Sequence, residues 1–285
     1  MKTFGQILPK RALSQNFLID KNIANKIVNS LDTKEGDIVI ELGCGTGALT
    51  QFLIEKKIKL IGLELDKKIS EALSEKFPNK KYKNFFLLNQ NVLDFNINEN
   101  FLTHGDNQKV KIIGNIPYSI SSQIFFWLFE QANFIDKAIL MVQKELAQRL
   151  TAKPKTKDYG IPTVALQLTG NAKRLFDVPP SCFYPQPAIM SSIIEINFND
   201  EQLGTEEFRT IMKFIRAAFS QRRKTLKNSL KNYIEQEIKT DYKKVLDDSS
   251  SAGIDYFSRR AEELTKEEFI RFYELLKKIS LVYLR

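Results

Sequence analysis

Residues 37–50 (Asp-Ile-Val-Ile-Glu-Leu-Gly-Cys-Gly-Thr-Gly-Ala-Leu-Thr) constrain the fold of this 285-residue chain more than any other segment. A β-branched run leads into three glycines at alternate positions, Gly43, Gly45 and Gly47, and then into an amphipathic stretch. A strand, a glycine-rich turn and a helix in this order form the nucleotide-binding half of a doubly wound α/β sheet. A second predicted strand ends at Glu64, whose carboxylate can accept hydrogen bonds from both ribose hydroxyls of a nucleoside.

The glycine turn by itself is compatible with two kinds of ligand. Gly43, Gly45 and Ala48 also match the dinucleotide fingerprint G-x-G-x-x-A, so a nicotinamide nucleotide is one candidate. Glu41, two residues before the first glycine, would repel a pyrophosphate but would suit a cationic amino-acid tail. The segment therefore favours S-adenosylmethionine, and the nicotinamide alternative stays open on this loop alone.

A second informative segment, residues 114–118 (Gly-Asn-Ile-Pro-Tyr), directly follows an apolar run. At the tip of a predicted strand, Asn115 offers an amide oxygen, Ile116 a backbone carbonyl and Tyr118 a flat ring. Pro117 lacks an N–H and biases the residue before it away from the helical region, so the turn is stiff. Two acceptors beside an aromatic ring suit a flat base with an exocyclic amino group, such as adenine with its N6.

Apolar periodicity predicts a largely parallel α/β sheet. We expect helices over 21–30 and about 67–77, strands over 37–42, 59–64, 85–88, 110–113 and 138–142, and late strand material over 188–198. Helix-like stretches lie between most of the strands, which favours a doubly wound architecture. Ligands bind outside the carboxyl ends of the strands in such sheets, so the glycine turn, Glu64, Asn91 and Asn115 are expected to meet there.

The composition argues against several classes of protein. No apolar run approaches 18 residues, and residues 1–11 lack the apolar core of a signal peptide, so we expect a soluble, cytoplasmic protein. Cys44 and Cys182 make neither a disulfide framework nor a metal set. The only histidine, His104, lies in a polar stretch and is expected to be an exposed loop residue. We therefore expect neither a metal site nor triad hydrolysis.

The character of the sequence changes after Asn199, where Glu- and Lys-rich amphipathic helices begin. We therefore predict an α/β domain of residues 1–203 and a small helical domain of residues 204–285. The net charge is +9, and residues 209–234 contain eight basic residues and no acid, beside an apolar stripe at helical spacing. If the stripe docks, the basic side chains face outward as a surface for RNA phosphates, the alternative being ordinary solvated charge.

The predicted RNA contacts fall into two basic clusters. The first comprises Arg222, Arg223, Lys224 and Lys227. The second borders the expected active-site side of the first domain and comprises Lys144 and Arg149 with Lys153, Lys155 and Lys157.

The chain resembles the KsgA and Erm superfamily of rRNA adenine N6-dimethyltransferases. The resemblance rests on Glu-Leu-Gly-Cys-Gly-Thr-Gly at 41–47 and Asn-Ile-Pro-Tyr at 115–118. Further matches are Ser-Gln-Asn-Phe-Leu at 14–18, Met-Val-Gln-Lys-Glu at 141–145, Asp-Tyr-Gly at 158–160, Phe-Tyr-Pro-Gln-Pro at 183–187 and Phe-Ser-Gln-Arg-Arg-Lys-Thr-Leu at 219–226. The last match is similar to the KsgA branch, which modifies small-subunit rRNA; the Erm branch lacks that basic helix.

The resemblance implies a Rossmann-like class I methyltransferase domain that uses S-adenosyl-L-methionine. The implied cofactor contacts are Asn16, Leu18, Gly43, Gly45, Glu64, Asn91 and Asn115. The implied catalytic residues are Asn115, Ile116 and Pro117, with Tyr118 and Phe183 stacking on the target base. The family usually has Asp where this chain has Asn91, and the amide oxygen can accept the same hydrogen bond from the cofactor adenine without the charge.

The implied reaction is dimethylation of N6 of two adjacent adenosines near the 3′ end of 16S rRNA, with a role in rRNA processing and small-subunit biogenesis. The implied partner is small-subunit rRNA or the 30S particle, and we expect a monomer without membrane contact. Two alternatives stay open: an Erm-like enzyme acting on 23S rRNA, and a ribosome-assembly or transcription factor that keeps the fold without turnover.

Overall fold

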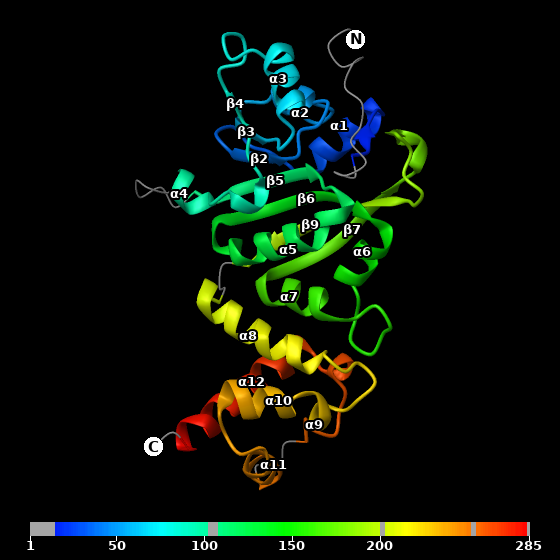
Figure 1. The fold of residues 1–285 in the computed structure, drawn as a ribbon. Helices are drawn as coiled ribbons and strands as arrows, with labels where there is room; N and C mark the ends of the chain where they lie inside the picture. Colours follow the sequence, from blue (N-terminus) through cyan, green and yellow to red (C-terminus); the bar gives the residue numbers. More distant parts are fainter. Residues whose placement is uncertain (1–14, 102–107, 200–202, 252–254, 284–285) are drawn as a thin grey trace. The chain divides into compact units, whose positions relative to one another are not determined.

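Figure 1 shows the fold in a computed structural model that describes residues 15–101, 108–199, 203–251 and 255–283. The chain divides into two compact units, Met1–Gln148 with Gly170–Gln202 and Arg149–Thr169 with Leu203–Arg285. Residues 149–169 therefore group with the C-terminal helices. The predicted domain boundary between residues 203 and 204 stays a prediction, and the expected exposed loop at His104 lies outside the described residues.

The first unit is built around a seven-stranded sheet with the order β4-β3-β2-β5-β6-β9-β7 (Figure 1). Its strands are β2 (Ile38–Leu42), β3 (Lys59–Leu63), β4 (Phe85–Leu88), β5 (Val110–Asn115), β6 (Ile135–Gln143), β7 (Gly170–Val178) and β9 (Ser191–Phe198). The strands from β4 to β6 are parallel, and β9 pairs antiparallel with both β6 and β7. The prediction of a largely parallel α/β sheet is confirmed.

The apolar strand runs have a simple physical origin. β2 pairs with β3 on one side and β5 on the other, and Val39, Ile40 and Leu42 are all buried. A parallel strand buried on both faces reads as a continuous rather than an alternating apolar run.

Three strands were not predicted. β7 is an edge strand, and its residues Asn171, Lys173 and Arg174 are exposed, so no apolar pattern marks it. The short strands β1 (Phe17–Leu18) and β8 (Phe183–Tyr184) pair antiparallel in a sheet of their own. A two-residue strand is too short for periodicity to reveal.

Helices connect the strands of the first unit. They are α1 (Lys21–Ser30), α2 (Thr50–Leu53), α3 (Lys67–Lys76), α4 (Ile97–Phe101), α5 (Ser121–Glu130) and α6 (Lys144–Leu150), whose last residues belong to the second unit. α1 and α3 begin where predicted, because the carboxylates of Asp20 and Asp66 accept hydrogen bonds from N–H groups of the first turn.

The described residues of the second unit form helices joined by turns and loops, and no strand. Its helices are α7 (Ile161–Thr169), α8 (Thr205–Ala218), α9 (Leu226–Ser229), α10 (Lys231–Tyr233), α11 (Tyr242–Ser251) and α12 (Lys266–Tyr283). The predicted apolar stripe is buried along α8, where the ring of Phe214 contacts Phe269 and Phe272 of α12. None of the helices within the described ranges combines the length and apolarity that crossing a bilayer requires.

Candidate active site

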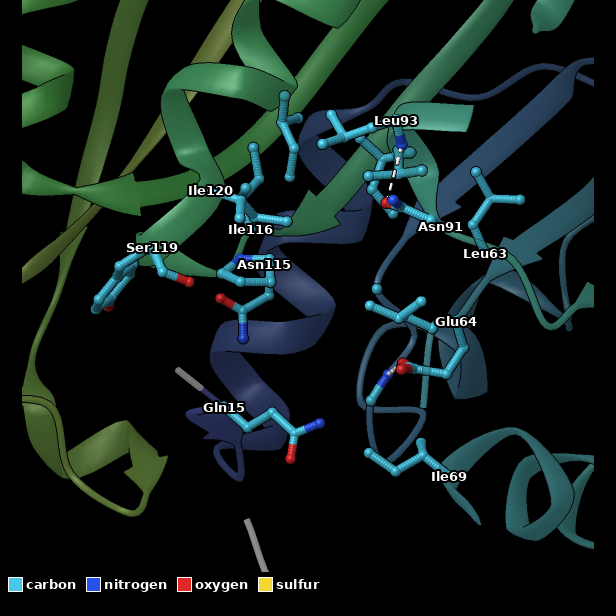
Figure 2. Close-up of a pocket in the computed structure, with 18 of the residues that line it drawn as sticks. Gln15, Leu63, Glu64, Ile69, Asn91, Leu93, Asn115, Ile116, Ser119 and Ile120 are labelled. Carbon is cyan, nitrogen blue, oxygen red and sulfur yellow. Dashed lines mark hydrogen bonds between the residues drawn. The ribbon is translucent and has the colours of Figure 1, made fainter. Parts of the chain in front are cut away.

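A cavity of about 240 Å³ lies at the carboxyl ends of the parallel strands (Figure 2). Its lining includes the glycine turn after β2, Glu64 after β3, Asn91 after β4 and residues 115–118, which begin with the last residue of β5. Parallel strands present their carboxyl ends at one edge of the sheet, so segments far apart in the sequence converge there. The predicted site residues that line the cavity are Asn16, Gly43, Gly45, Glu64, Asn91, Asn115, Ile116, Pro117 and Tyr118.

Gly45 and Glu64 form a hydrogen-bonded wall of the cavity. Gly45 has a φ of +55°, a left-handed conformation that glycine adopts readily, and its N–H donates to Oε2 of Glu64 at 2.9 Å. The N–H of Asp66 donates to Oε1 of Glu64, also at 2.9 Å. Burial raises the pKa of the Glu64 carboxyl, and the two N–H donors oppose that shift. Each carboxylate oxygen keeps a lone pair for a further donor, so Glu64 can still bind a diol.

Glu41 does not line the cavity. Its side chain is 1% exposed, and Oε2 accepts a hydrogen bond from the Thr50 hydroxyl at 2.7 Å. Burial raises the pKa of Glu41 to about 8, so the carboxyl is largely protonated at neutral pH. Glu41 thus ties the end of β2 to the start of α2, and the geometry does not offer it as an anionic partner for a cationic tail.

Asn91 caps the short turn that follows it. Its Oδ1 accepts a hydrogen bond from the N–H of Leu93 at 3.1 Å, drawn as a dashed line in Figure 2. A carbonyl oxygen can accept two hydrogen bonds, so the Asn91 oxygen retains one acceptor position for a ligand amino group.

Asn115 is held in one orientation at the end of β5. Its Nδ2 donates to the backbone carbonyl of Asn16 at 2.9 Å, which leaves Oδ1 as the acceptor in the cavity lining. The N–H of Ile116 donates to the Met141 carbonyl at 3.2 Å, whereas within the described part of the chain no donor reaches the Ile116 carbonyl. Figure 2 shows Asn115 and Glu64 on different sides of the cavity. The site therefore presents two fixed acceptors opposite the carboxylate.

Hydrogen bonds hold both the Tyr118 hydroxyl and the turn that precedes the ring. Its hydroxyl lies 2.6 Å from Oγ of Ser191, a fully buried residue of β9. The Ser121 hydroxyl donates to the Pro117 carbonyl at 3.0 Å and stabilises the turn before the ring. Burial raises the pKa of the Tyr118 phenol, so the hydroxyl stays protonated at neutral pH.

Two predicted site residues are absent from the cavity lining. Leu18 and Phe183 are register partners of β1 and β8, and both side chains belong to the hydrophobic core. Phe183 is only 1% exposed, so it offers no open face to a base in this structure.

Several lining residues were not predicted as site residues by the sequence analysis, and most of them carry no motif of their own. They are Gln15, Phe17, Leu42, Leu63, Leu65, Ile69, Gln90, Val92, Leu93, Ser119, Ile120 and Ile124. Gln15, Phe17 and Leu42 lie within the matched segments at 14–18 and 41–47, and the others lie near predicted strand ends or motifs.

A second cavity, of about 660 Å³, shares Gln15, Asn16 and Tyr118 with the first. The rest of its lining comes from Gln143, at the end of β6, and from residues 184–189. The two cavities therefore adjoin at Tyr118.

Some of the basic residues predicted to bind RNA form ion pairs with carboxylates, and the others do not. Lys144 pairs with Asp177 at 2.7 Å, and Arg222 pairs with Glu262 at 3.0 Å. Arg222 also donates to the backbone carbonyl of Lys157. The remaining predicted contacts are exposed and make no ion pair with any residue that the structure describes: Arg149, Lys153, Lys155, Lys157, Arg223, Lys224 and Lys227.

The acid-free run over residues 209–234 is partly compensated by carboxylates outside it. Arg209 pairs with Glu206 at 3.2 Å, and Lys213 pairs with Glu237 at 3.8 Å.

Across the described ranges, no cluster of three His, Cys, Asp or Glu side chains is arranged to hold a metal ion.

Comparison with known proteins gives a consistent result over most of the chain. The model of the family "Ribosomal RNA adenine dimethylase" matches residues 8–277. Ribosomal RNA small subunit methyltransferase A of Desulforapulum autotrophicum is 38% identical over 272 residues, covering 95% of this chain and 93% of that protein. The protein of the same name from Mycoplasma mobile is 43% identical over 240 residues, covering 83% of this chain and 89% of its own.

Two solved structures share the fold. A dimethyladenosine transferase from Plasmodium falciparum has a TM-score of 0.78 and 25% identity, with 92% of this chain and 98% of that chain covered. The 23S rRNA methyltransferase ErmE has a TM-score of 0.63 and 22% identity, with 92% and 100% covered. At that identity, the likeness to ErmE supports the fold alone.

Proposed function

The chain belongs to the ribosomal RNA adenine dimethylase family, and we propose that it methylates N6 of two adjacent adenosines near the 3′ end of 16S rRNA. Relatives between 33% and 43% identical are named ribosomal RNA small subunit methyltransferase A, which supports the small rather than the large subunit as substrate. The observation that carries the proposal is the fixed amide of Asn115, whose Oδ1 stands beside the Ile116 carbonyl as an acceptor for an exocyclic amino group.

The residues of the first cavity fit S-adenosylmethionine. The Glu64 carboxylate suits the ribose hydroxyls, and the remaining acceptor position of Asn91 suits the amino group of the cofactor adenine. A Cβ atom at position 45 would lie 3.3 Å from the Phe17 ring. Glycine therefore lets the turn pack closely against Phe17 without displacing its ring. When bound, S-adenosylmethionine supplies an electrophilic methyl group on a sulfonium. This fit and the family together favour it over a nicotinamide nucleotide.

The Asn115 and Ile116 acceptors would make adenine N6, which is a weak nucleophile, more reactive. The lone pair of adenine N6 is delocalised into the ring, so the planar amino group attacks poorly. Asn115 Oδ1 and the Ile116 carbonyl would accept its N–H groups and favour a pyramidal nitrogen, which stabilises the geometry of attack over the planar ground state. Holding the nitrogen in position contributes several kcal/mol more, up to about 7–11 in the best intramolecular cases.

The Tyr118 ring would hold the target base after it has been pulled from its stack. Base–aromatic stacking contributes roughly 1–3 kcal/mol per base. The buried hydrogen bond to Ser191 keeps the ring in place before the base arrives. Phe183, to which the family resemblance assigns a similar role, would have to leave the core to reach the base.

We assign RNA backbone contact mainly to a basic surface, defined here as Arg223, Lys224 and Lys227, with Arg149 as a further contact. These side chains are exposed and make no ion pair within the described residues, so their charge is available to phosphates. Lys144 and Arg222 are engaged with carboxylates, so we expect a smaller contribution from them. Since the proposed substrate is ribosomal RNA, we infer an enzyme of the cytoplasm, and we propose that it acts as a monomer.

The test is to incubate unmodified small and large ribosomal subunits with the protein and radiolabelled S-adenosylmethionine, and then to map the label. We expect dimethyladenosine at two adjacent positions near the 3′ end of 16S rRNA. Label in 23S rRNA would instead favour the Erm-like alternative. RNA binding without any label would favour the non-catalytic factor.

A further inference from the structure

Ser119 lines the first cavity with a hydroxyl that has no hydrogen-bond partner in the described part of the chain. Its side chain is exposed. The next serine, Ser121, differs: it is buried, it lies outside the cavity lining, and its hydroxyl donates to the Pro117 carbonyl at 3.0 Å. A hydroxyl can donate one hydrogen bond and accept two, so that of Ser119 is available to a ligand in the cavity.

The backbone around Ser119 is held by hydrogen bonds on both sides. Ser119 lies in the short 3₁₀ turn Tyr118–Ile120, and α5 begins directly after it. The Ile120 N–H donates to the Pro117 carbonyl at 3.3 Å, and the hydrogen bond to Ser191 holds the Tyr118 side chain. A ligand that binds the Ser119 hydroxyl therefore has to order only one short side chain, which costs little conformational entropy.

The position of Ser119 favours the target base over the cofactor as its ligand. Figure 2 shows Ser119 on the same side of the cavity as Asn115, with Glu64 and Asn91 across from them. Glu64 and Asn91 suit the ribose and the adenine of the cofactor, so the cofactor is expected on their side. The base to be methylated would bring its amino group to Asn115 and its face to the ring of Tyr118, the residue directly before Ser119.

The edge of adenine that carries N6 offers acceptors as well as donors. N6 is flanked by two ring nitrogens, N1 and N7, and both accept hydrogen bonds. The acceptors of Asn115 and Ile116 can bind the N–H groups of N6, but they cannot bind a ring nitrogen. A hydroxyl can, because it is also a donor. Ser119 therefore supplies the kind of group that the rest of this edge requires.

We propose that the Ser119 hydroxyl donates a hydrogen bond to a ring nitrogen of the acceptor adenine, N1 or N7, and so helps to select and orient this base. This inference rests on the proposed function. Methylation removes the N–H groups of N6 one by one, but the ring nitrogens remain acceptors. The contact with Ser119 therefore persists through both methyl transfers, when the contacts of Asn115 and Ile116 with N–H groups are being lost.

The test compares small subunits reconstituted with 16S rRNA that carries adenosine, 1-deazaadenosine or 7-deazaadenosine at both target positions. Each analogue replaces one ring nitrogen by C–H and keeps N6. Ser119→Ala should lower kcat/KM for adenosine about 2- to 13-fold, the range to which one neutral hydrogen bond converts. On the analogue that lacks the contacted nitrogen, variant and wild type should have equal kcat/KM. On the other analogue, the variant should lose the same factor as on adenosine.

Ser121→Ala is the matched control, because it removes a hydroxyl that stabilises the turn without lining the cavity. Any loss of kcat/KM in this variant should be the same on all three substrates. Calorimetry with S-adenosylhomocysteine should give Ser119→Ala the cofactor affinity of wild type. The inference is overturned if Ser119→Ala loses one factor on all three substrates, if it leaves kcat/KM for adenosine unchanged, or if it weakens cofactor binding instead.

The result for the wild-type protein separates this inference from the proposed function. Label in 23S rRNA would contradict the small subunit as substrate, and the same analogues placed at the labelled adenosine would then test Ser119. Absence of label from both subunits would contradict the proposed function and the role of Ser119 together.

Discussion

The first cavity and the basic surface use polar side chains in opposite ways. In the cavity, Glu64, Asn91 and Asn115 are each hydrogen-bonded to backbone groups, so their remaining atoms point in fixed directions. On the basic surface, Arg223 and Lys224 are exposed and form no ion pair with the rest of the described chain. Chemistry needs preorganised groups, whereas attraction of phosphates tolerates mobile ones.

This difference predicts which measurements respond to which region. Changes in the cavity should alter turnover or cofactor affinity with little dependence on salt. Changes on the basic surface should alter the salt dependence of RNA binding and leave the chemical step alone.

The largest expected effect concerns stability and comes from Glu41, which lies behind the cavity lining. Its pKa rises from 4.5 to about 8 on folding, so between these values the folded protein holds a proton that the unfolded chain releases. The free energy of unfolding should therefore fall as pH rises through this window, by up to about 5 kcal/mol. Glu41→Gln keeps an acceptor for Thr50 and should remove this dependence in urea unfolding at a series of pH values. Equal pH profiles for variant and wild type would show that Glu41 is ionised in the fold.

Asn115→Ala should lower kcat by about 10²–10³-fold, as does removal of one preorganised transition-state contact in other enzymes. Single-turnover methylation of small subunits would measure it, with calorimetry as the control, because cofactor affinity should change far less. Turnover near that of wild type would show that Asn115 does not contribute to the chemical step.

Glu64→Gln should weaken cofactor binding by about 1–3 kcal/mol. Glutamine keeps one oxygen but sets an NH₂ group against one of the N–H donors of Gly45 and Asp66. Calorimetry with S-adenosylhomocysteine gives the affinity, and NADH serves as the competing ligand. Tight NADH binding to the wild-type protein without a response to S-adenosylhomocysteine would contradict the assignment of the cavity.

The combined change Arg223→Gln and Lys224→Gln should have the smallest effect on activity. Two lost phosphate contacts would reduce the slope of log affinity against log salt by about 1.4–1.8 in total. Filter binding of small subunits over a salt series measures the slope, and cofactor affinity should be unchanged. The matched control is Arg222→Gln, which breaks an exposed ion pair with Glu262 and should cost at most about 1 kcal/mol of stability. An unchanged slope in the double variant would indicate that the RNA backbone contacts the basic residues between positions 149 and 157 instead.

The parallel part of the sheet was predictable because buried parallel strands are continuous apolar runs, as in β2. Strand ends with polar residues then indicated Glu64, Asn91 and Asn115 as neighbours. The edge strand β7 has no such pattern. The orientation of β8 depends on its pairing with β1, far away in the sequence, so the motif at 183–187 could not tell which ring is buried.

The ion pairs of the basic residues likewise could not be predicted from the sequence. Arg222 looked uncompensated because no acid lies near it in the chain, yet its carboxylate partner, Glu262, is 40 residues away. A charge run shows which residue types are present, but their partners depend on how the helices of the second unit fold together.

The most direct test of the central claim is a structure of the protein bound to S-adenosylhomocysteine and an RNA that contains the target adenosine. The account predicts that adenine N6 lies within hydrogen-bond distance of both Asn115 Oδ1 and the Ile116 carbonyl, with the cofactor ribose on Glu64. An adenine whose N6 lies away from both acceptors, or a cofactor bound outside the cavity at Glu64, would contradict it.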